Sequence, residues 1–167
     1  MSLRDRRSVI IVIILAAAAF SYYFWSTGNT AGDEVGKRAK DIELIGPDGE
    51  VFILSEYLGD AIVIDFMATW CGPCELQLRE LEELQDAVED VIIVSVEVDP
   101  TLSGEAFKQW AEEKGFKWFV GQSPDATRDY RISVIPTIVI VDPEGVIRYR
   151  GTYTTYEVLR DLVNEYK

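Results

Sequence analysis

An apolar strand that leads directly into an amphipathic helix, with two cysteines at the junction, constrains this fold most. Residues 61–68 are apolar and rich in β-branched side chains except for Asp65, which is typical of a buried central strand. From Leu78 onward, apolar residues recur at intervals of three and four, which predicts a helix with one apolar face. Gly72 and Pro73 lie where this helix begins, a position that tolerates proline because the first helical N–H groups have no partner within the helix.

Cys71 and Cys74 are the only cysteines in the chain, and two residues separate them. At a helix N-terminus the helix dipole favours the thiolate of Cys71, and the thiolate is the species that attacks in disulfide exchange. Cys74 lies one helical turn further in and is placed to attack the resulting mixed disulfide. We therefore predict that Cys71 is the nucleophile, that Cys74 is the resolving thiol, and that this redox-active disulfide needs no bound cofactor.

Other uses of the cysteine pair fit the sequence less well. A structural disulfide across two residues would close almost no loop and would stabilise little. A zinc site needs about four ligands, and this chain has no histidine and no third cysteine. Attachment of a c-type haem needs histidine after the second cysteine, where Glu75 stands. No Pro-x-x-x-Thr-x-x-Cys pattern leads to Cys71, which disfavours a peroxidase.

The N-terminal region has the pattern of a membrane anchor. Residues 1–7 contain three arginines, and residues 9–25 contain no charged side chain, a run just long enough to cross a bilayer. Arginines before the run and acidic residues after it orient the N-terminus toward the cytoplasm. The alternative is a cleaved signal peptide, because Ala17 to Ala19 offers small residues for cleavage. Both interpretations place the domain outside the cytoplasmic membrane. The predicted division is a cytoplasmic N-terminus at 1–7, a transmembrane anchor at 8–25, a flexible linker at 26–40 and a folded domain at 41–167.

Strands and helices are expected to alternate in the rest of the chain. Alternating apolar residues around the turn at 46–49 predict a β-hairpin over 41–54, and a short helical turn follows at 55–59. The apolar run at 118–120 is too short to assign. Further strands are expected at 91–98, 137–141 and 146–150, and further helices at 103–114, 125–130 and 154–166. This order predicts an α/β sandwich with a mixed sheet.

The segment 63–74, which ends in Trp70-Cys71-Gly72-Pro73-Cys74, resembles the active-site segment of the thioredoxin superfamily. The hairpin at 41–54 and the N-terminal anchor are similar to those of membrane-anchored TlpA-like and ResA-like thiol–disulfide oxidoreductases. The stretch from 100 to 131 matches an insertion of that family. The resemblance implies a thioredoxin-like sandwich with a mixed central sheet, an N-terminal hairpin extension and a middle insertion, preceded by one transmembrane helix.

The resemblance also implies roles for residues outside the cysteine pair. Ile135 and Pro136 match the cis-proline loop that faces the two cysteines and binds the backbone of the partner. Trp70, Gly72 and Pro73 are expected to contact the substrate. Asp65 matches a buried acid, and because burial disfavours its charged form, we expect a raised pKa. Such an acid is suited to take the proton of Cys74 when that thiol attacks.

These features together predict an extracytoplasmic oxidoreductase that reduces protein disulfides, for example before haem attachment in cytochrome c maturation. The resemblance suggests a membrane electron donor of the CcdA or DsbD type. Oxidation or isomerisation of secreted proteins is an alternative, because the sequence does not define the reduction potential. A redox-regulated binding domain without turnover is another. The net charge of −13 argues against nucleic acid as a partner.

Overall fold

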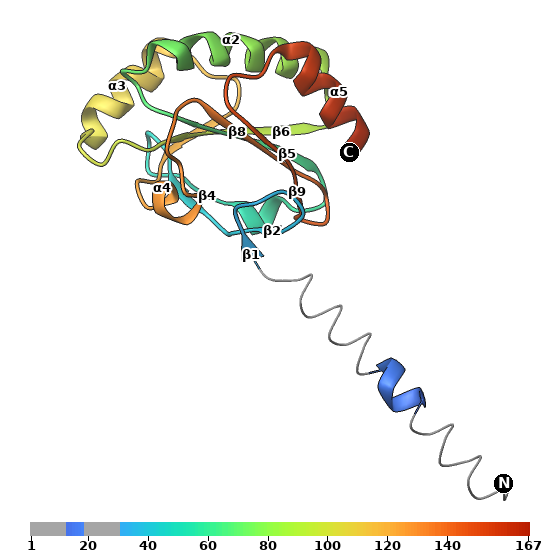
Figure 1. Cartoon of the computed structure of the whole chain (residues 1–167). Helices are drawn as coiled ribbons and strands as arrows, with labels where there is room; N and C mark the ends of the chain where they lie inside the picture. The colour runs from blue at the N-terminus through green and yellow to red at the C-terminus, as the bar shows by residue number, and fades with distance from the viewer. Residues whose placement is uncertain (1–12, 19–30) are drawn as a thin grey trace, which may run out of the picture. The chain divides into compact units, whose positions relative to one another are not determined.

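A seven-stranded mixed sheet forms the centre of the computed structural model, which describes residues 13–18 and 31–167 (Figure 1). The two strands in the middle of the domain, β5 and β6, pair in parallel, and β8 runs antiparallel to β5 on its other side. In spatial order the strands are β4 (Val51–Ile53), β3 (Glu43–Ile45), β7 (Phe119–Gln122), β6 (Val91–Glu97), β5 (Ala61–Met67), β8 (Thr137–Val141) and β9 (Ile147–Gly151). The order of strands and helices agrees with the predicted mixed α/β sandwich.

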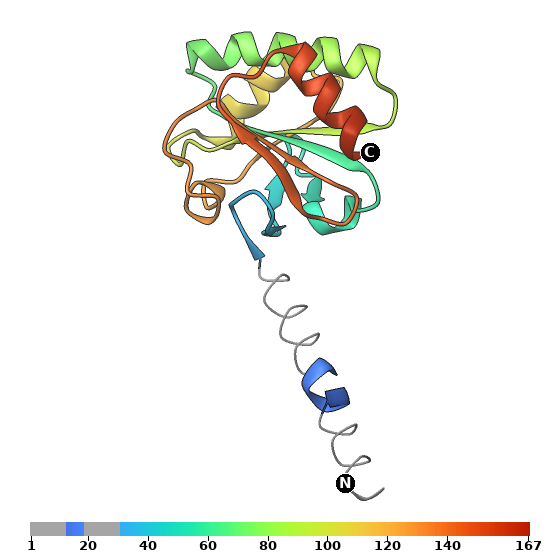
Figure 2. The ribbon, with the colours of Figure 1, turned by 45° about the vertical axis from the view of Figure 1, so that its right-hand side comes forward.

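Helices cover the two faces of this sheet unequally. Figures 1 and 2 show the longer helices on one side of the sheet and the short helix α4 on the other, and the β3–β4 hairpin forms one edge of the sheet itself. The helices on the first face are α2 (Gly72–Ala87), α3 (Gly104–Lys114) and α5 (Tyr156–Tyr166). The second face carries α4 (Ala126–Asp129) and the 3₁₀ helix η1 (Leu54–Tyr57). A sheet covered on both faces explains why every residue of β5 is buried.

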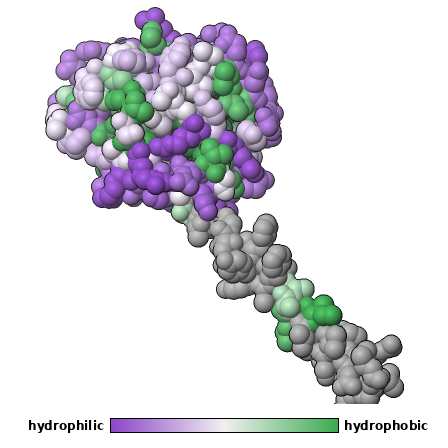
Figure 3. Space-filling model, viewed as in Figure 1, coloured by the Kyte–Doolittle hydropathy of each residue, from purple (hydrophilic) through white to green (hydrophobic). Residues whose placement is uncertain are grey.

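Two hydrophobic cores lie on opposite faces of the sheet because successive side chains of a strand point in opposite directions. Ile62, Ile64 and Phe66 of β5 belong to the core on the α4 face. Ala61 and Val63 pack in the other core, with leucines from the apolar face of α2. The same alternation directs Asp65 toward the face that α2 covers. The outer surface is mainly hydrophilic on the side seen in Figure 3, where hydrophobic side chains form separate patches.

The predicted middle insertion contributes a strand to the sheet. The unassigned run at 118–120 overlaps β7, which pairs in parallel with β6 on one side and antiparallel with β3 on the other. The predicted hairpin at 41–54 is confirmed as β3 and β4, with Leu44 opposite Phe52. The strand β7 therefore joins the hairpin extension to the central strands.

Residues before the sheet include β1 (Ala31–Gly32) and β2 (Arg38–Ala39), which form a separate two-stranded sheet. Of the predicted anchor at 8–25, only residues 13–18 are described, and these are helical. The rest of the anchor and residues 26–30 of the linker lie outside the described residues. Within 13–18 and 31–167, no helix has the length and apolar character that a bilayer span requires.

Candidate active site

Cys71 and Cys74 form a disulfide at the start of α2, with their sulfur atoms 2.09 Å apart. Cys71 is the N-cap residue of the helix, and its Sγ accepts a hydrogen bond from the backbone N–H of Cys74 at 3.2 Å. Pro73 lies in the first turn, as its lack of an N–H donor permits. The Sγ of Cys71 therefore receives both a direct N–H contact and the positive end of the helix dipole, which stabilise its thiolate after reduction.

Both cysteines are buried in the disulfide form, Cys74 slightly more than Cys71. Cys71 is 5% exposed and Cys74 is 1% exposed in the disulfide form. Both pack with Met67 and Ala68 from the end of β5, and Trp110 and Ile135 border this cluster. Of the two cysteines, Cys71 is therefore the slightly more exposed residue.

The loop before β8 lies against the cysteine cluster, although it follows Cys71 by more than sixty residues in the chain. The Ile135–Pro136 peptide bond is cis, which confirms the expectation drawn from the resemblance. Ile135 packs against the cysteine cluster, and the Thr137 hydroxyl donates to the carbonyl of Val134 at 2.7 Å. This hydrogen bond closes the loop locally around Pro136. Of the two loop residues that the resemblance assigned to partner binding, Ile135 lies against the cysteine cluster.

A largely apolar groove with a volume of about 270 Å³ lies between Trp70 and this loop. Trp70 is 70% exposed, and its indole N–H donates to the Asp99 carboxylate at 2.7 Å. Hydrogen bonds from Thr101 and Trp70 lower the pKa of Asp99 and keep this carboxylate charged. The lining residues are Ala68, Trp70, Val98, Asp99, Pro100, Thr127, Ile132, Ser133, Val134 and Ile135. The groove has the apolar lining and single charged group suited to an extended polypeptide that carries an apolar side chain.

Asp65 is completely buried in β5, two residues before the end of the strand. Burial raises its pKa to about 7, against a smaller opposing effect of the Ser95 hydroxyl, which lies 3.2 Å from Oδ2. Its other oxygen, Oδ1, has no hydrogen-bond partner among the described residues. Asp65 faces the side of the sheet covered by α2, the helix that carries Cys74, so the predicted buried acid and the resolving thiol share one layer of the structure.

Several further residues near the site were not predicted from the sequence. Glu97 is buried at the end of β6 and accepts hydrogen bonds from the backbone N–H groups of Thr69 and Asp99, at 2.7 and 2.8 Å. Burial raises the pKa of Glu97. Because Thr69 precedes Trp70, this carboxylate joins the two loops that carry Trp70 and its hydrogen-bond acceptor. An acidic residue in an apolar strand was a signal available in the sequence, as it was for Asp65.

Gln77, one turn after Cys74, is also completely buried. Its side chain donates to the carbonyl of Thr154 at 3.0 Å and accepts from the N–H of the same residue at 2.7 Å. This pair of hydrogen bonds ties α2 to the segment before α5. Among the described residues, no group of three or more His, Cys, Asp or Glu side chains is arranged to hold a metal ion.

Comparisons with known proteins agree with this geometry. The model of the AhpC/TSA family matches residues 35–150. The thiol–disulfide oxidoreductase ResA of Geobacillus kaustophilus is 31% identical, with 77% of this chain and 76% of the relative covered. The thioredoxin domain of a thiol–disulfide oxidoreductase from Bacteroides vulgatus superimposes with a TM-score of 0.67 at 24% identity, covering 82% of this chain and 98% of that domain. The pneumococcal exposed lipoprotein thioredoxin of Streptococcus pneumoniae superimposes with a TM-score of 0.64 at 26% identity, covering 75% of this chain and 99% of the other.

Proposed function

Because the chain belongs to the AhpC/TSA family and is a thiol–disulfide oxidoreductase, we propose that it reduces disulfide bonds of proteins outside the cytoplasmic membrane. The observation that carries the proposal is the position of Cys71. Its Sγ is the N-cap group of α2 and lies in the cluster that Ile135 borders, next to the groove along Trp70. A polypeptide in that groove brings its own disulfide to the sulfur that the helix activates.

The proposed reaction has two exchange steps. The Cys71 thiolate attacks one sulfur of the substrate disulfide, that S–S bond breaks, and the departing sulfur takes a proton from solvent. Cys74 then attacks the Sγ of Cys71 in the mixed disulfide, and the second substrate sulfur leaves and is protonated. Two electrons pass from the Cys71–Cys74 dithiol to the substrate, and a dithiol donor must restore the reduced pair.

Asp65 is proposed to accept the proton that Cys74 loses in the second step. A thiol is a poor nucleophile until it is deprotonated, and a base inside the same layer removes the need for bulk water at the buried sulfur. A pKa of about 7 suits this task, because such a group both accepts and returns a proton near neutral pH. The carboxylate returns its proton when the donor reduces the disulfide again.

The proposed site of action is the outer side of the cytoplasmic membrane, with residues 8–25 as a single-span anchor. The length of this run supports a single span, and the arginines before it support the outward orientation of the domain. A relative of similar fold is described as an exposed lipoprotein thioredoxin. Reduction in that compartment requires electrons that cross the membrane, so we propose a CcdA- or DsbD-like donor and, as one substrate, a cytochrome c apoprotein before haem attachment.

Reduction of insulin disulfides by the full-length chain, with dithiothreitol as the reductant, tests the activity. We expect turnover by the wild type and its loss in Cys71→Ser, because no other sulfur receives the N-cap hydrogen bond. Cys74→Ser, first reduced and then freed of dithiothreitol, should instead accumulate a mixed disulfide with insulin that is visible on a non-reducing gel. Turnover that survives Cys71→Ser would contradict the proposed nucleophile, and a chain that binds insulin without turnover would favour a redox-regulated binding domain.

A separate experiment tests the location. Cells that express the chain with a C-terminal tag are divided into two samples. One sample is lysed and fractionated, and protease is added to intact protoplasts prepared from the other. We expect the full-length chain in the carbonate-washed membrane pellet, with the tag removed by protease. A soluble product that begins near Phe20 would favour the signal peptide, and a tag protected from protease would contradict the outward orientation.

A further inference from the structure

We infer that Ser95 and Trp118 are positioning residues for Asp65: they hold its Oδ2 atom as a hydrogen-bond acceptor and leave Oδ1 to carry the exchangeable proton. The inference deepens the proposed function, since it rests on Asp65 as the group that accepts the proton of Cys74. It assigns the proton to one of the two carboxyl oxygens. It also gives a role to two residues that the thiol chemistry itself does not use.

A chain of two hydrogen bonds carries the inference. The indole Nε1–H of Trp118 lies 3.0 Å from the Oγ of Ser95, and that Oγ lies 3.2 Å from the Oδ2 of Asp65. An indole N–H is a donor only, so Ser95 must accept from Trp118. The Ser95 hydroxyl then directs its single proton to Asp65, which makes Oδ2 an acceptor. A protonated Asp65 consequently carries its proton on Oδ1, the oxygen that has no partner among the described residues.

Strand register explains why these residues meet. Asp65 of β5 stands opposite Ser95 in the parallel pair with β6 and opposite Ile138 in the antiparallel pair with β8. Trp118 directly precedes β7, the next strand beyond β6. A hydroxyl at position 95 therefore lies between the acid on one neighbouring strand and the indole on the other.

Among the side chains that face Asp65, Ser95 is the one that donates a hydrogen bond to its carboxylate and so stabilises the charged form. From β6, Ser95 and Glu97 lie on the same face, and both oxygens of Glu97 are occupied by backbone N–H groups. From β8, the opposite residue is the apolar Ile138. The residues that α2 buries are Cys74, Gln77, Leu78, Leu81 and Leu84, and none of them carries an ionisable group while Cys74 is held in the disulfide. The effects that set the pKa of Asp65 are burial, which raises it, and the Ser95 hydrogen bond, which lowers it.

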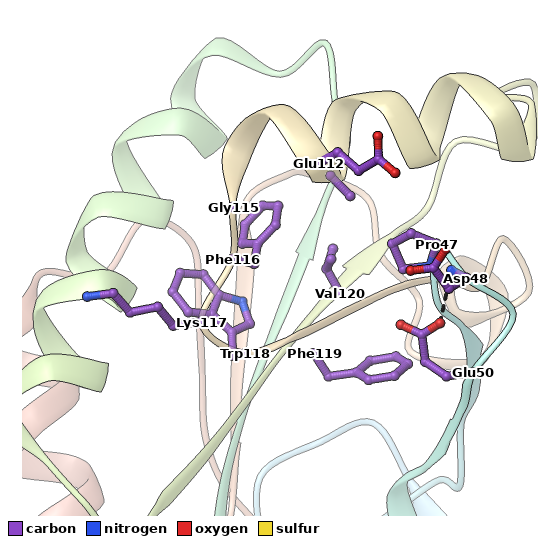
Figure 4. A pocket seen from close by; sticks show the side chains of 11 residues that line it. Pro47, Asp48, Glu50, Glu112, Gly115, Phe116, Lys117, Trp118, Phe119 and Val120 are labelled. Atoms are coloured by element: carbon purple, nitrogen blue, oxygen red, sulfur yellow. Dashed lines mark hydrogen bonds between the residues drawn. The ribbon is translucent and has the colours of Figure 1, made fainter.

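Trp118 is held in place by neighbouring aromatic rings rather than by its hydrogen bond alone. Its ring packs edge-on against Phe116 with centroids 5.3 Å apart, and Phe116 in turn packs against Trp110 at 5.1 Å. Figure 4 shows Trp118 and Phe116 next to each other beyond the end of α3. Trp118 also lines a cleft of about 240 Å³ with Glu75 and Leu78 of α2. The indole thus reaches from the lining of this cleft to the buried Ser95 hydroxyl.

The direct test is the protonation midpoint of Asp65 in the oxidised full-length chain, read from the pH dependence of its ¹³C-carboxyl NMR signal and assigned with Asp65→Asn. Ser95→Ala removes the donor to Oδ2, so the midpoint should rise by about one pH unit. Trp118→Phe keeps an aromatic ring but frees the hydroxyl to turn and accept from a protonated carboxyl, so the midpoint should rise as well. Ser123→Ala removes a hydroxyl elsewhere in the chain, so it should leave the midpoint in place.

An unchanged midpoint in Ser95→Ala or in Trp118→Phe would overturn the inference, and so would an equal rise in Ser123→Ala. The same variants are compared for the rate at which the mixed disulfide is resolved, as a function of pH. The half-maximal pH of this rate should rise together with the NMR midpoint and should not respond to Ser95→Ala when Asp65 is already asparagine. NMR midpoints that shift while insulin reduction is absent would reject the proposed function but keep the assignment of the proton to Oδ1.

Discussion

Asp65→Asn tests how much the ionisation of a buried acid lowers the unfolding free energy, apart from the proposed role of this acid as proton acceptor for Cys74. The change keeps the size of the side chain and removes its charge. Asp65 is completely buried, so solvent does not screen its ionisation. The effect on stability should therefore depend on pH in a manner that the structure defines.

The magnitude follows from the pKa of Asp65, which burial raises from the ordinary value of 3.8 to about 7. Between these values the unfolded chain has lost the proton and the folded chain keeps it, so stability falls as the pH rises. Each pH unit corresponds to about 1.4 kcal/mol, and the full interval to roughly 4 kcal/mol. The penalty is absent below about pH 4 and complete above about pH 7. Asparagine does not ionise, so the variant does not show this pH-dependent loss of stability.

Guanidinium denaturation of the oxidised full-length chain at pH 4 and pH 8 measures the effect. We expect Asp65→Asn to match the wild type at pH 4 and to exceed its unfolding free energy by up to roughly 4 kcal/mol at pH 8. Asp90→Asn, which changes an exposed aspartate, is the control and should show no such difference. A variant that is less stable than the wild type at pH 8, or one whose advantage does not change with pH, would refute the reasoning.

Three further substitutions test the packing around the site by denaturant unfolding at one pH. Leu81→Ala empties a completely buried position on α2 and should cost about 2–5 kcal/mol; a loss below about 1 kcal/mol would mean that the core closes the cavity. Gln77→Leu leaves the N–H and carbonyl of Thr154 without their partners and should cost about 2–4 kcal/mol, with Gln109→Leu on the exposed side of α3 as the neutral control. Gly115→Ala places a side chain at φ +64° after α3 and should cost about 1 kcal/mol, whereas an unchanged midpoint would contradict the left-handed cap.

The sequence was most informative where the signals are local. The run at 61–68, the cysteine spacing and the leucines of α2 predicted the strand, the active-site turn and the helix, because their periodicity depends on near neighbours. The buried acid Asp65 was predictable for the same reason, since an ionisable residue interrupts an apolar strand. The cis bond at Pro136 came from the resemblance, because proline by itself is cis in only a small minority of cases.

The sequence was insufficient where an apolar run is short or where the role of a residue depends on a distant segment. Residues 118–120 were too few to distinguish a strand from a helix, and only pairing with β3 and β6 makes β7 a strand. Glu97 stands in an apolar strand, which signals a buried acid, but the sequence does not show which groups that acid binds. Its role depends on the backbone of Thr69, a residue of a different loop.

What the sequence determined by itself is the chemistry of two sulfurs at a helix start, because cap, dipole and cysteine spacing are all contained within a few consecutive residues. What only the tertiary structure decided is which side chains form hydrogen bonds around Asp65. Ser95 stands thirty residues away and Trp118 more than fifty, and they meet the acid through the parallel order of β5, β6 and β7. Strand order and register arise from the burial of whole faces, which no local pattern encodes, and so the hydrogen bonds that govern the buried acid appear only once the sheet is assembled.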